Sequence, residues 1–116
     1  MISEDTHQKI LNLDPKIRFS GVVNNKSEIL ASHSPEGTER LLTDDEVKMS
    51  IHYTLERFEK TSNLSYKIGE EKSSIIQYEK VTLITIPLNK QEFLLLSTEP
   101  DANYLDIIAN VLGLIS

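Results

Sequence analysis

The sequence contains no cysteine and no tryptophan, and its four glycines stand apart from one another. Without cysteine the chain can form no disulfide, no thiolate nucleophile and no cysteine-bound zinc or iron–sulfur centre. Isolated glycines exclude a glycine-rich phosphate-binding loop. No apolar run approaches the roughly 20 residues of a membrane-spanning helix, and the acidic, polar start of the chain does not resemble a signal peptide. We therefore expect a cytoplasmic protein that carries no cofactor.

Positive charge is also scarce. The 116 residues include 12 Lys and Arg against 18 Asp and Glu, which gives a formal net charge of -6. Nucleic acids and anionic membranes attract clustered basic surfaces, so we expect neither as a partner. Hydrophobic residues make up 39% of the chain and charged residues 26%, as in ordinary globular proteins. A chain of this length fits a single domain, residues 1–116.

The hydrophobic pattern changes its period several times along the first half of the chain. Helical spacing after Ser3, with Ile2, Thr6, Ile10 and Leu13 on one side, predicts a short helix that ends before Pro15. Alternation over 17–23 and a turn-rich Asn24-Asn25-Lys26-Ser27 predict a hairpin with a second strand over 28–32. An irregular connection, 34–42, follows.

The middle of the chain predicts a long amphipathic helix. Thr43 and Glu46 have the spacing of a capping box, in which each side chain accepts a hydrogen bond from the backbone of the other residue. A buried stripe is expected on one face of this helix. It consists of Val47, Ile51, Leu55 and Phe58. The helix should end between Lys60 and Gly69.

Three strands are expected over 74–79, 81–88 and 92–98, and Pro100-Asp101 should open a very apolar final helix. The second and third of these strands carry apolar residues on both faces, which indicates central strands covered on both sides. The first is more polar at its ends, as edge strands often are. The pattern predicts an α+β fold of order α-β-β-α-β-β-β-α, with helices on both faces of a five-stranded antiparallel sheet.

This order of elements resembles the profilin-like and roadblock-type domains, and the hairpin 17–32 is similar to the roadblock pattern of strand, turn and strand. Four phrases also resemble a family of small uncharacterised archaeal proteins. They are Leu13-Asp14-Pro15-Lys16-Ile17-Arg18-Phe19, Leu42-Thr43-Asp44-Asp45-Glu46, Tyr78-Glu79-Lys80-Val81 and Thr98-Glu99-Pro100-Asp101-Ala102. Roadblock relatives are typically dimeric, non-enzymatic regulators or scaffolds. The resemblance therefore implies a homodimeric interaction module with no chemistry of its own.

Candidate contact residues lie on the outer face of the middle helix and on the expected edge strand. Met49 and Tyr53 fall opposite the buried stripe, and methionine and tyrosine are enriched in protein interfaces. Ile75 and Tyr78 belong to a strand whose free edge could pair with its own copy across a two-fold axis. The competing interpretation is an ordinary surface with single exposed apolar residues and an edge covered by a loop.

No motif predicts catalysis or a metal site. His7, His33 and His52 lack the spacing of metal ligands, and helix capping explains the acidic residues 44–46. The alternative function is a small-molecule sensor similar to profilin-like and PAS-like sheets, with its ligand between sheet and helix under the 34–42 connection. Inward polar residues such as Thr85 and Ser97 would then contact the ligand, and a cavity on the order of a few hundred Å³ would be needed.

Overall fold

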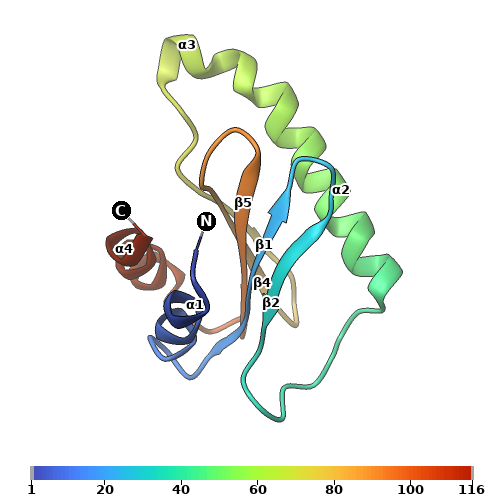
Figure 1. Cartoon of the computed structure of the whole chain (residues 1–116), viewed down its shortest axis with the longest axis vertical. Helices are drawn as coiled ribbons and strands as arrows, with labels where there is room; N and C mark the ends of the chain where they lie inside the picture. The colour runs from blue at the N-terminus through green and yellow to red at the C-terminus, as the bar shows by residue number, and fades with distance from the viewer. Residues whose placement is uncertain (1, 116) are drawn as a thin grey trace.

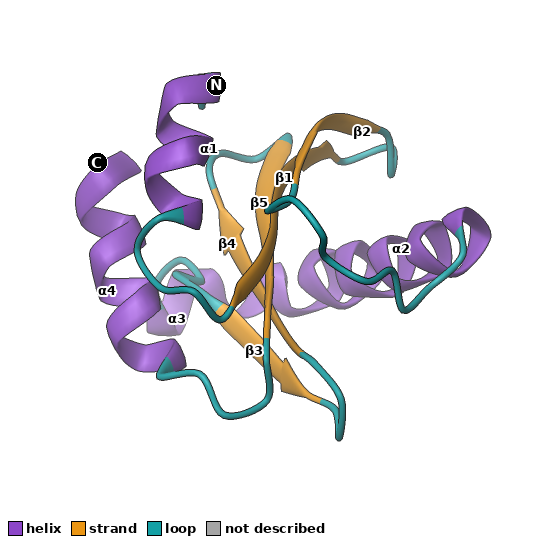
Figure 2. Ribbon diagram, turned by 90° about the horizontal axis from the view of Figure 1, so that it is seen from below, coloured by secondary structure: helices purple, strands orange, loops and turns teal. Residues whose placement is uncertain are grey.

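The computed structural model describes residues 2–115 and contains a five-stranded antiparallel sheet between two layers of helices (Figure 1). The strand order across the sheet is β2-β1-β5-β4-β3. The strands are β1 (Ile17–Asn24), β2 (Ile29–His33), β3 (Ser74–Gln77), β4 (Thr82–Pro87) and β5 (Glu92–Thr98). Helices α1 (Glu4–Leu11) and α4 (Tyr104–Ile115) cover one face, and α2 (Asp44–Thr61) lies on the other (Figure 2). The predicted fold class and element order are confirmed, with β4 and β5 inside the sheet and β3 at an edge.

The middle helix begins where its capping pattern predicts. The Glu46 N–H donates to Thr43 Oγ1 at 3.2 Å, and the Thr43 N–H donates to Glu46 Oε1 at 2.9 Å. These bonds hold the Glu46 carboxylate in its charged form and lower its pKa. After α2 the chain continues through a 3-10 turn, η1 (Ser62–Leu64), and a short helix, α3 (Ser65–Ile68), and it stops at Gly69, whose φ is 89°.

The final helix begins later than predicted. Pro100 and Asp101 form a turn, closed by the Ala102 N–H donating to the Glu99 carbonyl at 3.2 Å, and α4 starts at Tyr104. The Asn103 side chain accepts a hydrogen bond from the Asp106 N–H at 3.3 Å and so takes the capping place. The prediction was wrong because proline fits a turn as well as a helix start.

The first half shows three details that the sequence did not predict. Leu13 lies beyond the end of α1 and is 36% exposed, while the predicted stripe is completed by buried His7 and Leu11. In the β1–β2 turn the positive φ, 64°, falls on Ser27. The β1–β2 pairing also contains an irregularity between Val22 and Val23, where the register shifts.

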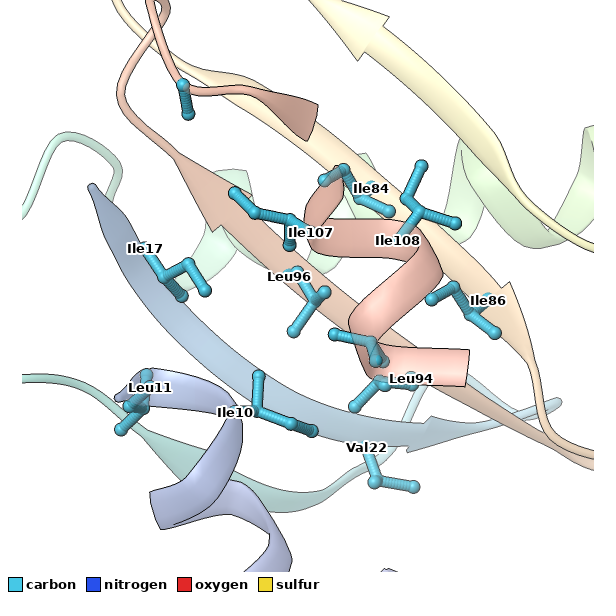
Figure 3. Packing of buried hydrophobic residues seen from close by; sticks show 12 residues of the cluster. Ile10, Leu11, Ile17, Val22, Ile84, Ile86, Leu94, Leu96, Ile107 and Ile108 are labelled. Carbon is cyan, nitrogen blue, oxygen red and sulfur yellow. The ribbon is translucent and has the colours of Figure 1, made fainter. Parts of the chain in front are cut away.

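The two faces of the sheet are packed very unequally. The larger core cluster lies under α1 and α4, where Ile10, Leu11, Ile107 and Ile108 pack over the strands (Figure 3). The smaller cluster, between α2 and the sheet, has three buried members. They are Val23, Ile51 and Phe93. The other predicted stripe residues of α2 pack around these three, which confirms the stripe, and the Phe58 and Phe93 rings meet edge to face at 4.8 Å. Helix α2 therefore rests on the sheet through a narrow contact.

Candidate functional site

The outer face of α2 carries the two candidate contact residues of the helix. Met49 is 58% exposed and Tyr53 is 62% exposed, although both are large apolar or aromatic side chains. They lie opposite Val47 and Ile51, which face the sheet. The structure therefore presents two interface-type side chains on one exposed helix face.

Strand β3 presents the second candidate surface. It pairs only with β4 among the described strands, so its other edge is unpaired within residues 2–115. Tyr78, just past the strand, is 55% exposed, whereas Ile75 packs partly buried against the larger core cluster. The Tyr78 N–H donates to the Val81 carbonyl at 2.8 Å, and hydrogen-bonded pairs alternate along an antiparallel ladder. The backbone groups of Ile75 and Gln77 therefore point away from β4, toward the free edge.

Arg57 joins these two surfaces. Its Nη1 donates to Glu71 Oε1 at 2.7 Å, and its Nη2 donates to Glu71 Oε2 at 3.0 Å and to Ser74 Oγ at 3.3 Å. The bidentate bond to Glu71 raises the pKa of Arg57. Since Arg57 lies one helical turn after Tyr53 and Ser74 begins β3, the guanidinium fixes the flank of α2 beside the sheet edge.

A third exposed apolar group was missed by the sequence analysis. Leu64, Tyr66 and Ile68 on η1 and α3 are 54%, 82% and 79% exposed. Their spacing of two is that of a strand and not of a helical stripe, so it predicts no common buried face for a helical segment, and that mismatch was the available signal. The segment that carries them follows the C-terminal end of α2, and Figure 1 shows α3 at that end of the helix.

A cleft of about 500 Å³ lies between α2 and the sheet, on the side where the 34–42 connection passes. Its floor includes Leu83, Thr85, Leu95 and Ser97 of β4 and β5. Its roof is formed by the first half of α2, and residues 38–42 form one wall. The structure thus brings together the polar residues and the connection that the alternative, ligand-binding prediction named.

Both arginines that line the cleft are paired with acidic residues. Arg18 Nη1 donates to Glu99 Oε1 at 2.8 Å, and Arg18 Nη2 donates to the Glu39 carbonyl at 2.5 Å. Arg40 forms an ion pair with Asp44 at the start of α2, and its Nε donates to the Leu42 carbonyl at 2.7 Å. These bonds fasten the connection to β1 on one side and to α2 on the other.

A buried histidine cluster lies on the opposite face of the sheet. His7 of α1 stacks on His33 of β2 with ring centroids 4.5 Å apart, and His7 Nδ1 lies 2.7 Å from Ser20 Oγ of β1. Burial and the neighbouring His33 lower the pKa of His7. Because His7 and Ser20 are only 1% and 0% exposed, a substrate cannot reach this Ser–His pair. The sequence separation of these residues concealed the cluster, which depends on β2 pairing with β1.

Residues 2–115 contain no group of three or more His, Asp or Glu side chains placed to hold a metal ion. Within the same residues, no helix combines the length and the apolar character needed to cross a membrane.

A sheet covered by a helix pair on one face and one long helix on the other defines an α+β class that includes the profilin-like and roadblock domains. Solved structures identify the fold as roadblock/LC7. The gliding protein MglB from Thermus thermophilus matches with a TM-score of 0.73 and 14% identity, over 94% of this chain and 78% of that one. A roadblock/LC7 domain from Streptomyces avermitilis matches with a TM-score of 0.73 and 8% identity, over 99% and 92%. An MglB described as having a tetrameric arrangement matches with a TM-score of 0.73 and 14% identity, over 94% and 78%.

No protein-family model and no curated protein sequence matches the chain. At such low identities the structural likeness establishes the fold. The narrower resemblance to small archaeal proteins stays a prediction.

Proposed function

We propose that this protein is a non-enzymatic, homodimeric interaction module of the roadblock type, acting in the cytoplasm. The observation that carries the proposal is the exposed α2 face, fixed beside the unpaired edge of β3 by Arg57. A roadblock/LC7 fold is consistent with it, since regulators and scaffolds are common among proteins of this fold.

In the proposed dimer, the two β3 strands pair across a two-fold axis. The outward backbone groups of Ile75 and Gln77 would supply the hydrogen bonds, and the sheet would continue from one copy into the other. Met49 and Tyr53 of each α2 would add apolar contact on the adjoining face, with Tyr78 at the margin of the strand. This arrangement assigns backbone contacts to Ile75, whose side chain packs inward, and side-chain contacts to the other three candidates.

Light scattering across a dilution series tests the dimer. The expected result is a mass twice the chain mass of 13.2 kDa. The double variant Met49→Glu/Tyr53→Glu should shift the mass toward that of the monomer, because charges at an apolar contact must be desolvated. Leu105→Glu is the matched control, since Leu105 is 67% exposed but lies on α4, across the sheet.

Gln77→Pro tests the strand pairing separately. Proline removes the outward N–H of β3 while leaving the bonds to β4 in place, so it should weaken association without unfolding the chain. A monomeric wild type at every concentration would reject the dimer. A double variant that keeps the wild-type mass would reject the assignment of Met49 and Tyr53 to the interface.

A further inference from the structure

We propose that the cleft between α2 and the sheet binds an uncharged, largely apolar small molecule that hydrogen-bonds to the hydroxyls of Thr85 and Ser97. The cavity volume of about 500 Å³ falls within the roughly 300–1,000 Å³ of small-molecule sites. This inference concerns the inner face of α2, and it is independent of the dimer proposed for the outer face.

The cleft follows from the way α2 meets the sheet. The α2 residues that line it all fall between Asp44 and Thr54, whereas Leu55 and Phe58, farther along the helix, pack in the smaller core cluster. Helix α2 therefore closes on the sheet around Leu55 and Phe58, and the cleft lies beside its first half, where Val47 and Ile51 both line the cleft and pack in the smaller cluster. Figure 1 shows the 34–42 connection running from β2 to the beginning of α2.

The interior of the cleft is apolar with a few hydroxyl groups. Phe19, Leu83 and Leu95 on the sheet face Val47 and Ile51 on the helix. This composition matches ligand pockets, in which apolar walls supply most of the contact area and a few polar groups orient the ligand.

Two hydroxyls in the floor are available to a ligand. Neither the Thr85 hydroxyl nor the Ser97 hydroxyl forms a hydrogen bond with the side chains or backbone of residues 2–115, and neither is sealed off in the interior, so both reach the open space of the cleft. A ligand donor or acceptor can replace the solvent at such a hydroxyl, and a few polar groups of this kind orient a ligand in an apolar pocket. The floor therefore favours a ligand with at least one donor or acceptor in its apolar body.

The charges around the cleft favour an uncharged ligand. Arg18 and Arg40 already bind Glu99 and Asp44, and each also donates to a backbone carbonyl of the connection. An anionic ligand group would have to leave water without an unpaired positive charge to receive it, which is unfavourable. The Glu39 carboxylate also lines the cleft, but Glu39 is exposed, and an ion pair formed at an exposed carboxylate contributes little. The bonds of Arg18 and Arg40 also hold the connection against the cleft and keep its wall in place.

Fluorescence titration with two probes tests the proposal. N-phenyl-1-naphthylamine is uncharged, whereas 1-anilinonaphthalene-8-sulfonate has a similar ring system and a negative charge. The uncharged probe should bind saturably at one molecule per chain, and the anionic probe at least about tenfold more weakly. Similar affinity for both probes would contradict the proposed preference for an uncharged ligand.

Cleft-filling variants locate the binding. Ser97→Leu fills the cleft from the floor and Val47→Trp fills it from the roof, so each should weaken the uncharged probe by at least about tenfold. Ser73→Leu is the matched control, because Ser73 lies outside the cleft. Circular dichroism and light scattering should show an unchanged fold and mass. Two cleft-filling variants are used so that, if one of them does not fold, the other still tests whether the probe binds in the cleft.

Three results would overturn the proposal. One is the absence of saturable binding to the wild type, and another is undiminished binding to a folded filling variant. The third is probe binding that appears only in the monomeric Met49→Glu/Tyr53→Glu variant, which would show that a second copy of the chain occupies the cleft. Because the dimer is measured separately by mass, failure of either proposal leaves the other standing.

Discussion

The unequal packing of the two sheet faces predicts unequal costs for two similar core truncations. Leu94→Ala and Ile51→Ala each remove three carbon atoms from a nearly fully buried side chain, at 0% and 4% exposure. At about 0.8 kcal/mol per buried methylene, the loss of burial alone is about 2.4 kcal/mol for each. Leu94 lies inside the larger cluster, so its truncation also leaves an enclosed cavity, and the expected total is about 3 to 5 kcal/mol.

Ile51 borders the open cleft, so its truncation enlarges a space that solvent already reaches. No enclosed cavity is added, and the expected loss stays at about 2.4 kcal/mol. Urea unfolding followed by circular dichroism measures both values, and unchanged m-values would show that the unfolded states remain comparable. Leu105→Ala, at an exposed position of α4 outside the proposed interface, should change the free energy of unfolding by less than about 0.5 kcal/mol.

Equal losses for Leu94→Ala and Ile51→Ala would refute this reasoning. They would mean that α2 packs on the sheet as closely as α1 and α4 do, and that the cleft is closed in solution. A larger loss for Ile51→Ala would give the same conclusion more strongly.

Further predictions concern glycine, helix capping and pH. A Cβ at Gly21 would lie 2.7 Å from a backbone oxygen of β2, so Gly21→Ala should destabilise the protein by about 1–3 kcal/mol in urea unfolding. Gly113→Ala, where a Cβ meets nothing within 4 Å on α4, should instead stabilise it by about 0.5–1 kcal/mol. Thr43→Ala removes the hydroxyl that accepts the Glu46 N–H in the capping box and should cost about 1 kcal/mol, measured by urea unfolding. The lowered pKa of His7 means that the unfolded chain binds the proton more tightly, so stability is complete above about pH 6.5 and falls as the pH drops below it. The pH dependence of unfolding between about pH 8 and 5 should flatten in His7→Gln but not in His52→Gln, and equal slopes in both variants would contradict the assignment.

Local chemistry explains what the sequence could predict. The capping box at Thr43 and Glu46 and the stripe of α2 involve residues within a few helical turns, so spacing alone identifies them. The exposed positions of Met49 and Tyr53 follow from the same helical geometry. Central and edge strands were distinguished because apolar residues on both faces of a strand indicate cover on both sides.

Features that depend on contacts between residues far apart in the sequence could not be predicted from it. The stack of His7 on His33 requires Ser20 to sit opposite His33 in the β1–β2 register and α1 to dock over them. The spacing of these residues along the chain therefore does not predict the contact between His7 and His33. The inward packing of Ile75 was likewise invisible, because it depends on which face of β3 turns toward α4. The start of α4 was misplaced for a different reason, since a proline is compatible with both a turn and a helix start.

The two edges of the sheet differ in a way that limits how far copies of this chain could add to one another. Edge β3 is regular along its pairing with β4, while β2 joins β1 through the register shift at Val22 and Val23. Irregular pairing of this kind twists an edge and makes it a poor template for another strand. If each β3 edge pairs with its copy across a two-fold axis, only the β2 edges remain free at the two ends of the extended sheet. Strand addition then stops at two copies. The assembly is a closed dimer and not an open-ended fibre.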